Sequence, residues 1–403
     1  MILSALSRRV FGAGFAAALI LAGCRVNETA VPVTAVLAPA AAVTAVLSPT
    51  PAPQTQSPSP TAGALSAPPG AVTVPPTTNP TQTPGPTTAP VPADHPLLPY
   101  TIAGMRDRDY PGGEIQIANL QEENEYYRRY FFVYPSDGLT ISGVMNVPRG
   151  QGPFPVVILL HGYFQRDQYY TGADTWQAAD LFARNGYLAI APDYRSWGSS
   201  ESGASFFHTG LVADVMNLIN SLPSLPQADA GRVGLMGHSM GGGIATKILT
   251  ISDSVSAAVL HAPNSADDAD LIGRWGPGCL PGQSEADGDK CNPGEVIPED
   301  LPDDLVESYL EAAGDRQFLQ LVAPINYLEA VKAPVQIHIG EADGETLLQT
   351  PPQWSQKLYE ALQAAGAEVE FFSYADQGHY FGSPAWGQLM NRALAFFDEQ
   401  LKS

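Results

Sequence analysis

The stretch Gly237-His238-Ser239-Met240-Gly241 has the pattern G-x-S-x-G and lies between two runs of different character. The apolar run before it, residues 231–236, predicts a β-strand, and the small residues 242–246 predict a closely packed helix. A sharp strand-to-helix turn needs glycine at its flanks, because a Cβ atom there would clash with the backbone. The pattern therefore predicts that Ser239 stands at the tip of a turn with its hydroxyl exposed.

A serine hydroxyl is a poor nucleophile at neutral pH, so it needs a base, and the base needs an orienting acid. In a parallel sheet with this turn, the acid and then the base follow the serine along the chain. Asp343 follows a strand predicted at residues 335–339, and His379 follows one predicted at residues 369–374. Both are expected at carboxyl ends of strands, where sites form in such sheets. We therefore predict a catalytic triad of Ser239, Asp343 and His379.

Alternatives exist for the acid, because Glu341 and Glu345 lie in the same loop as Asp343. The remaining histidines are less suited to be the base, since they lie in the linker, precede every candidate acid, or fall within a strand. They are His95, His161, His208, His238, His261 and His338.

An oxyanion hole is predicted after the first long apolar strand, at Leu160-His161-Gly162-Tyr163. Gly162 lets the backbone turn so that the N–H of Tyr163 faces Ser239, and the N–H of Met240 opens the following helix. Two such donors stabilise the oxyanion of a tetrahedral intermediate. The alternative is that Gly162 serves only to end the strand. Three aromatic residues are candidates to line an acyl pocket, with burial in the core as the alternative: Trp197, Phe206 and Trp275.

Strand and helix patterns alternate from about Leu97 to the end of the chain and begin with a hairpin around Ser136-Asp137-Gly138. Buried strands are predicted at 156–160, 187–191, 232–236, 256–260, 335–339 and 369–374. Helices are predicted near 174–185, 211–222, 242–249, 303–313, 353–365 and 385–401. This alternation predicts an α/β fold with a mainly parallel sheet, helices on both faces and an antiparallel edge hairpin.

One connection, between the strands at 256–260 and 335–339, is about seventy residues long, which is unusual inside a domain. We predict that residues 264–332 form a lid insertion over the carboxyl ends of the strands; the alternative is a loop that never approaches the site. Cys279 and Cys291 are predicted to form a disulfide within it, with two free thiols as the alternative.

Charge and composition exclude some partners. The net charge is −21 with 15% charged residues, so neither nucleic acid nor an anionic lipid surface is an expected partner. Neither a metal nor an organic cofactor is implied by any motif.

The first 24 residues read as an export signal. Arg8-Arg9 precede an apolar stretch that ends in Leu21-Ala22-Gly23-Cys24. This order is similar to the lipobox of bacterial lipoproteins, in which the cysteine corresponding to Cys24 is lipidated. The alternative is an ordinary signal peptide. Residues 25–96 are rich in Pro, Thr, Ala, Val and Ser and are predicted to be a disordered linker. The protein is thus expected outside the cytoplasmic membrane, held by a lipid anchor, with residues 97–403 as its catalytic domain.

Further segments extend the pattern to most of the folded region, about residues 130–401. They are Ser136-Asp137-Gly138 with Ile141-Ser142-Gly143, Pro155 to Gly162, Gly186-Tyr187, Ala191-Pro192-Asp193-Tyr194-Arg195, Ala333-Pro334 and Gln377-Gly378-His379. With the Ser239 turn, they resemble the α/β-hydrolase superfamily, within it the prolyl oligopeptidase and dienelactone-hydrolase-like branch. The resemblance implies that Asp193 and Arg195 brace loops.

Two departures from these families shape the expected activity. Prolyl oligopeptidases carry a β-propeller before the hydrolase domain, and too few residues precede the hairpin here for one. Dienelactone hydrolases use a cysteine nucleophile, whereas this chain has Ser239, in a turn similar to that of cutinase-like polyester hydrolases. The expected activity is hydrolysis of small-molecule or polymeric carboxylic esters through an acyl-enzyme. A peptidase or amidase, and a non-catalytic surface-binding protein on a hydrolase scaffold, remain alternatives.

Overall fold

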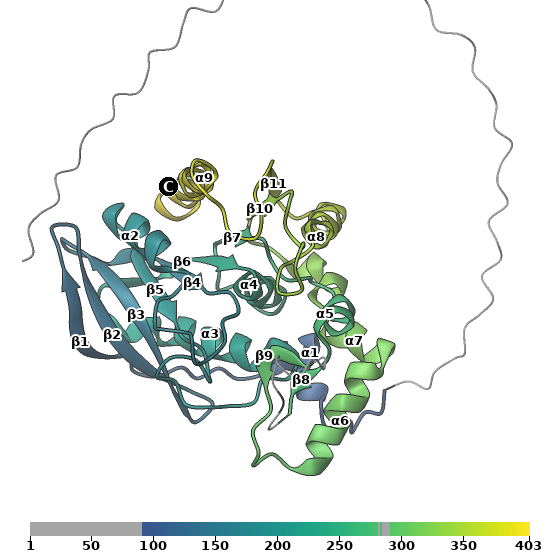
Figure 1. The fold of residues 1–403 in the computed structure, drawn as a ribbon. Coiled ribbons are helices and arrows are strands. Elements are labelled where there is room, and N and C mark those ends of the chain that lie inside the picture. Colours follow the sequence, from purple (N-terminus) through teal and green to yellow (C-terminus); the bar gives the residue numbers. More distant parts are fainter. Residues whose placement is uncertain (1–90, 281–282, 284–290) are drawn as a thin grey trace, which may run out of the picture. The chain divides into compact units, whose positions relative to one another are not determined.

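A nine-stranded sheet forms the centre of the computed structural model, which describes residues 91–280, 283 and 291–403 (Figure 1). Its strand order is β1-β2-β3-β5-β4-β6-β7-β10-β11. The strands are β1 (Gln116–Glu123), β2 (Tyr127–Ser136), β3 (Leu139–Pro148), β4 (Phe154–Leu160), β5 (Leu188–Pro192), β6 (Ala228–His238), β7 (Ala257–His261), β10 (Val335–Gly340) and β11 (Val369–Tyr374). From β5 to β11 all neighbours pair in parallel, whereas β1, β2, β3 and β5 are joined by antiparallel pairing. The predicted fold class is confirmed.

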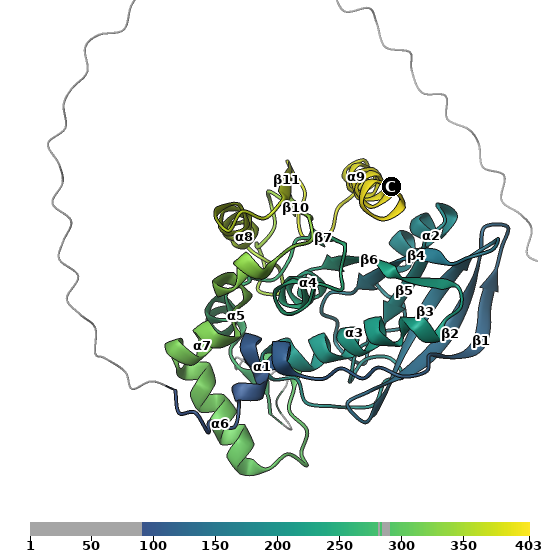
Figure 2. The same cartoon turned by 180° about the vertical axis from the view of Figure 1, so that it is seen from behind.

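Helices cover both faces of the sheet (Figures 1 and 2). The helices are α1 (Ile102–Asp107), α2 (Trp176–Arg184), α3 (Thr209–Ser221), α4 (Met240–Ile251), α5 (Asp268–Trp275), α6 (Asp303–Gly314), α7 (Arg316–Val322), α8 (Pro352–Ala364) and α9 (Ala385–Lys402). Helices α2 and α9 share one face, and α3, α4 and α8 pack on the other. Of these helices, the sequence patterns missed the three shortest, α1, α5 and α7.

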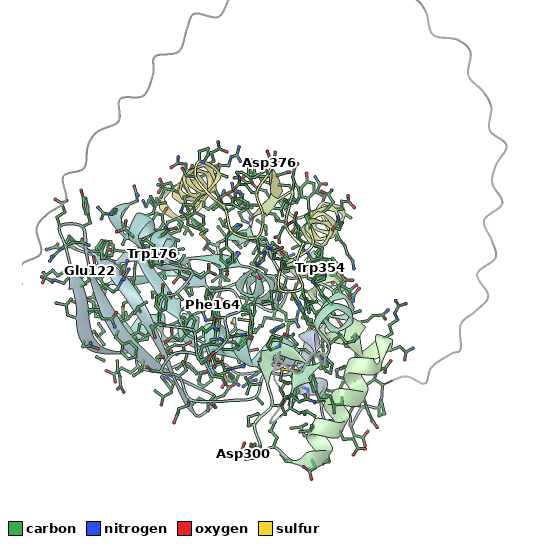
Figure 3. The ribbon with its side chains drawn as sticks, in the orientation of Figure 1. Glu122, Phe164, Trp176, Asp300, Trp354 and Asp376 are labelled. Atoms are coloured by element: carbon green, nitrogen blue, oxygen red, sulfur yellow. A yellow bond between two sulfur atoms is a disulfide. The ribbon has the colours of Figure 1, made fainter. Side chains whose placement is uncertain are left out.

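The sequence patterns also missed strand β1, which forms one of the two edges of the sheet. All eight of its residues are exposed, including Glu122, which is labelled in Figure 3. A strand without a buried face carries no alternation of apolar and polar residues, so periodicity does not reveal it.

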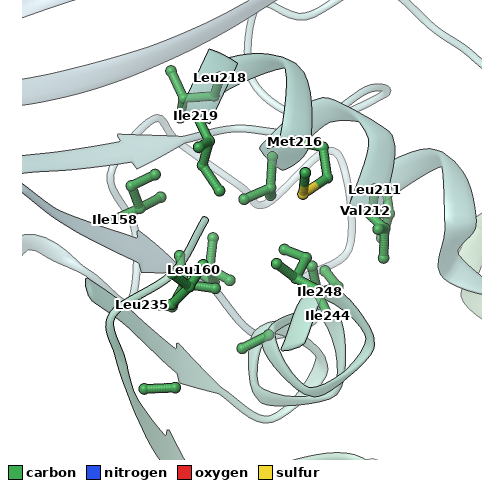
Figure 4. Close-up of a cluster of buried hydrophobic side chains, with 14 of the residues drawn as sticks. Ile158, Leu160, Leu211, Val212, Met216, Leu218, Ile219, Leu235, Ile244 and Ile248 are labelled. Carbon is green, nitrogen blue, oxygen red and sulfur yellow. The ribbon is translucent and has the colours of Figure 1, made fainter. Parts of the chain in front are cut away.

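The core forms where branched side chains of the central strands meet α3 and α4 (Figure 4). Ile158 of β4 and Leu235 of β6 are fully buried in the same cluster as Met216 and Ile244 of these helices. On the other face, the rings of Phe182 in α2 and Phe397 in α9 pack edge to face, with centroids 5.5 Å apart. These contacts fix the central strands, whose carboxyl ends carry the candidate site.

Between β7 and β10 the chain forms α5, two short paired strands, α6 and α7. The strands are β8 (Gly278–Cys279) and β9 (Asn292–Val296). A disulfide connects Cys279, in β8, to Cys291, the residue before β9. Tyr309 and Phe318 of the insertion pack against Phe206 and Phe207 in a separate apolar cluster. Among the described helices, none is both long and apolar enough to cross a bilayer.

A buried arginine connects the edge hairpin to the helix layer. The Nη2 atom of Arg195 lies 2.8 Å from carboxylate oxygens of both Asp137, in the β2–β3 turn, and Asp214, in α3. Its Nε donates a second bond to Asp214 at 3.0 Å. Asp193 accepts bonds from Ser142, Thr171 and Tyr169. Both residues thus hold loops in place.

We predict that Arg195→Met lowers the free energy of unfolding by about 3–5 kcal/mol, because it leaves the buried Asp214 carboxylate unpaired. The matched control is Arg128→Met, which removes an exposed ion pair with Glu123 and is expected to leave stability near wild type. Urea unfolding of the three proteins measures the difference. Equal losses in both variants would refute the structural role of Arg195.

Candidate active site

The turn between β6 and α4 places Ser239 at its tip with φ 54° and ψ −117°. Its backbone is held on both sides, because its N–H donates to the carbonyl of His261 and its own carbonyl accepts from the N–H of Asn264, both at 2.9 Å. A non-glycine residue in this region of φ is strained and persists only where its surroundings impose it. Such strain is typical of functional sites.

Glycine is required on both sides of the serine. A Cβ atom on Gly241 would lie 2.1 Å from the carbonyl oxygen of Leu160, at the end of β4. A Cβ atom on Gly237 would lie 2.3 Å from the carbonyl oxygen of Gly241. The turn and strand β4 are therefore in direct backbone contact, and no side chain fits between them.

Asp343 and His379 come together at the ends of neighbouring parallel strands, β10 and β11. The Nδ1 atom of His379 lies 2.9 Å from Oδ2 of Asp343 and 3.1 Å from Oδ1, and both residues are buried. Thr350 adds a hydroxyl 3.0 Å from Asp343 Oδ2. Of the alternative acids, Glu341 is bonded to Ser373 and Glu345 is exposed.

The loop after Asp343 is held by the first helix of the insertion. Nη2 of Arg274 in α5 donates to the carbonyl of Thr346 at 2.6 Å, and its Nε donates to the carbonyl of Leu347 at 3.2 Å. The indole N–H of Trp275 donates to the same Leu347 carbonyl at 2.6 Å. The position of the acid therefore depends on residues of the insertion as well as on β10.

A second acid–imidazole pair lies beside the first. Nδ1 of His238 lies 2.8 Å from Oδ2 of Asp174, and its Nε2 lies 3.1 Å from the backbone carbonyl of His379. The Asp174 carboxylate also accepts the N–H of Gly162 at 2.9 Å. His238 is the residue before Ser239, so this chain of bonds connects the β4 loop, the serine turn and the histidine loop.

Both ring nitrogens of His238 face oxygen acceptors, so both carry hydrogen and the ring is protonated beside an ionised Asp174. Burial opposes this charge, but Asp174 and the His379 carbonyl outweigh burial and raise the pKa of His238. Burial likewise opposes ionisation of Asp174, yet His238 and the Gly162 N–H lower its pKa. The result is a buried ion pair whose positive ring centroid lies 4.7 Å from that of His379.

The pKa of His379 is lowered by this setting. Burial is the largest cause, the bond to Asp343 opposes it, and the charge on His238 lowers the pKa further. A lowered pKa keeps the imidazole neutral, and so able to accept a proton, at more acidic pH than an ordinary histidine.

A small pocket of about 30 Å³, here called the Ser239 pocket, adjoins the serine. Tyr163 and Met240, the two predicted oxyanion donors, both line it. Gly162 approaches the site closely, since a Cβ atom there would lie 3.2 Å from the Cβ of Ser239. The insertion supplies Asn264, Trp275, Asn292, Pro293 and Gly294 to the wall, and His208 and Leu348 complete it. Of the three aromatic candidates, only Trp275 lines the pocket; Trp197 and Phe206 follow the alternative, because both are buried in the core.

Buried ionisable groups hold the insertion against the rest of the domain. The carboxylate of Glu295 in β9 accepts the backbone N–H of His208, and burial raises the pKa of Glu295 to about 8. Nearby, Nζ of Lys247 in α4 binds Asp268 in α5 at 2.8 Å. Within residues 91–280, 283 and 291–403, no cluster of His, Cys, Asp and Glu is arranged to hold a metal ion.

Comparison with known families fits this arrangement. The sequence profile described as "Alpha/beta hydrolase family" matches residues 157–389, a range that includes Ser239, Asp343 and His379. The chain belongs to this family. This membership agrees with the resemblance seen in the sequence.

Several known proteins are similar to parts of the chain. The Lysophosphatidylserine lipase ABHD12 of Danio rerio is 25% identical over 34% of this chain and 38% of its own length. Esterase FrsA of Shigella boydii is 27% identical over 30% of this chain and 28% of its own. The chain therefore matches well under two thirds of these relatives.

Two solved structures share the fold. Acetyl Xylan Esterase 1 from Thermoanaerobacterium sp. has a TM-score of 0.52 at 19% identity, covering 74% of this chain and 90% of its own. An acylaminoacyl peptidase has a TM-score of 0.52 at 21% identity, covering 69% of this chain and 42% of its own.

Asp174, His238 and Thr350 were missed as residues that organise the site. Chain order argues against His238 as the base, because His238 precedes every candidate acid. That argument does not apply to a residue that only positions others. Asp174 lies in a loop with φ 67°, outside any motif, so its partner is set by tertiary structure alone.

We predict that an NMR titration of His379 has its midpoint below pH 6.5, the ordinary value for histidine, because burial and the His238 charge disfavour the imidazolium form. His238→Gln removes that charge and is expected to move the midpoint upward. His95→Gln, remote from the site, is the control and leaves the midpoint unchanged. A midpoint at or above 6.5 in the wild type would contradict the electrostatic account.

Proposed function

We propose that this protein is a serine hydrolase that cleaves carboxylic esters through an acyl-enzyme. The observation that carries the proposal is the buried Asp343–His379 pair, at 2.9 Å, held against the residue that precedes Ser239. The strained turn at Ser239 and the close approach of Gly162 support it. Several similar proteins are esterases or lipases by name, which favours esters as substrates.

In the proposed mechanism, Ser239 Oγ forms a bond to the acyl carbon while its proton passes to the imidazole of His379. Asp343 holds the ring and stabilises the imidazolium that forms. The carbon–oxygen bond to the alcohol then breaks, and His379 returns the proton to the departing oxygen. Water next attacks the acyl-enzyme with His379 as base, releasing the acid and restoring the serine.

The oxyanion is proposed to bind to the N–H groups of Tyr163 and Met240. Met240 is the first residue of α4, where helix N–H groups lack intrahelical partners. Tyr163, which follows β4, lines the same pocket as Met240. Removal of one such donor typically costs about 3 kcal/mol of transition-state stabilisation.

We also propose export and anchoring through the amino terminus, with residues 1–24 as a lipoprotein signal, 25–96 as a linker and 97–403 as the catalytic domain. Cys24, the proposed lipidation site, lies outside the described residues. The Cys279–Cys291 disulfide supports an oxidising compartment. Residues 264–332 are proposed to act as a lid, consistent with the insertion residues that line the Ser239 pocket.

Ser239→Ala is expected to abolish hydrolysis of short-chain nitrophenyl esters and labelling by a fluorophosphonate, because the nucleophile is gone. Wild-type protein should cleave these esters faster than a matched panel of peptide and anilide substrates. Ser265→Ala, which removes a nearby buried serine hydroxyl, is the control and should retain labelling. Equal turnover of esters by Ser239→Ala would refute the proposal, and preferential cleavage of amides would favour a peptidase.

Asp343→Asn is expected to lower kcat on the same esters by about 10⁴-fold, because the amide favours the wrong imidazole tautomer. Glu341→Gln, in the same loop, is the matched control and should retain kcat. If Glu341→Gln were the damaging change, Asp343 would not be the orienting acid.

A further inference from the structure

A cavity of about 350 Å³ lies beside the catalytic loops and shares no lining residue with the Ser239 pocket. We call it the aromatic cavity. Helices α2 and α9, the ends of β4, β6 and β7, and the segment after His379 contribute its walls. Five aromatic rings and two imidazoles line it: Phe164, Trp176, Tyr380, Phe381, Trp386, His238 and His261. Phe164 and Trp176 are labelled in Figure 3.

Its placement follows from the three loops that build the proposed site. In the first two loops, Tyr163 and Ser239 line the Ser239 pocket, while their neighbours Phe164 and His238 line the aromatic cavity. In the third, Tyr380 lines the cavity directly after His379. The cavity and the pocket are therefore lined by neighbouring residues of the same loops, which also carry the groups that would bind and cleave an ester.

One polar atom in the cavity wall has no partner. Nε2 of His261 is buried and makes no hydrogen bond within the described chain. The His261 ring stacks on His238, with centroids 4.6 Å apart, and meets Phe381 edge to face at 4.4 Å. Burial, and next the charge on His238, lower the pKa of His261, so this ring is neutral. A neutral imidazole nitrogen donates or accepts according to its tautomer, and a hydroxyl group satisfies either one.

The charge in the wall selects against ionised ligands. Asp174 lines the cavity, but its carboxylate is already paired with His238. No unpaired cation is therefore available in the wall to bind a carboxylate or phosphate.

The aromatic walls favour a flat ring as ligand, because rings pack edge to face or offset at centroid distances of about 4.5–7 Å. The volume is near the lower end of the range for small-molecule sites, about 300–1,000 Å³.

We propose that the aromatic cavity binds the alcohol part of the ester substrate, as an uncharged aromatic ring that carries a hydroxyl group. This inference rests on the proposed function. The alcohol is assigned to this side because Tyr380 adjoins His379, which would return the proton to the departing oxygen. The acyl group is assigned to the Ser239 pocket, with the proposed oxyanion donors. The Ser239 pocket is the smaller of the two spaces, at about 30 Å³ against about 350 Å³, so the smaller part of the substrate is assigned to it, an acyl group such as acetyl.

The test compares three acetates that differ only in the alcohol: 3-hydroxybenzyl, benzyl and cyclohexylmethyl acetate. Wild-type kcat/KM should fall in that order, with the hydroxyl worth about tenfold, the effect of one hydrogen bond to a buried partner. His261→Leu should abolish the preference for 3-hydroxybenzyl over benzyl acetate while keeping benzyl above cyclohexylmethyl. Trp176→Leu, at a half-exposed ring, should reduce the preference for benzyl over cyclohexylmethyl acetate. Tyr126→Leu, an exposed ring far along the chain from the cavity, should keep both preferences.

A binding measurement separates this inference from the proposed function. Calorimetric titration of Ser239→Ala protein with 3-hydroxybenzyl alcohol should show binding that His261→Leu, added to it, weakens about tenfold. If no acetate is hydrolysed but the alcohol binds in this way, the esterase proposal fails and the cavity assignment stands as a binding site. If the acetates are hydrolysed without preference, or the alcohol binds equally well after His261→Leu, the cavity assignment is overturned.

Discussion

The backbone turn at Ser239 is the constraint on which the rest of the site depends. Its φ of 54° is unfavourable for a serine, and the turn is maintained by bonds to His261 and Asn264 and by contact with the end of β4. That contact needs glycine at 237 and 241, because even a methyl group would collide with backbone oxygen. The core packing of β4, β6 and α4 holds these segments at that distance. The free energy of the hydrophobic core thus stabilises a local conformation that would not persist alone.

Two acid–imidazole pairs lie around the turn. The inner pair is Asp343 with His379, and the outer pair is Asp174 with His238. The His238 ring donates a hydrogen bond to the backbone carbonyl of His379, which links the two pairs. The outer pair therefore does two things at once. It fixes the loop that carries the proposed base, and it places a buried positive charge where it disfavours protonation of that base. Low dielectric strengthens both effects, because few waters screen the charges.

Sequence patterns predicted well those helices and strands that are buried on one face or on both. Parallel strands such as β4 and β5 are continuous apolar runs, and α8 and α9 have clear helical periodicity, so their positions agree with the structure within a few residues. Strand β1 was not predicted, because it is exposed on both faces and its sequence shows no alternation of apolar and polar residues. The order Ser239, Asp343, His379 could be predicted from the sequence, because each of these residues follows a recognisable strand. Asp174 could not be predicted as a site residue, because it acts only when its loop packs beside the serine turn. For a related reason the sequence leaves open whether Trp197 and Phe206 lie in a pocket or in the core, because an aromatic side chain suits both.

The bonds from Arg274 and Trp275 to the loop after Asp343 bear on how such an enzyme diversifies. Insertions between strands are commonly regarded as interchangeable modules that alter specificity while the scaffold stays constant. In this chain the first helix of the insertion also holds the backbone that presents the acid. Shuffling or shortening this segment would perturb the scaffold's own geometry unless α5 were retained.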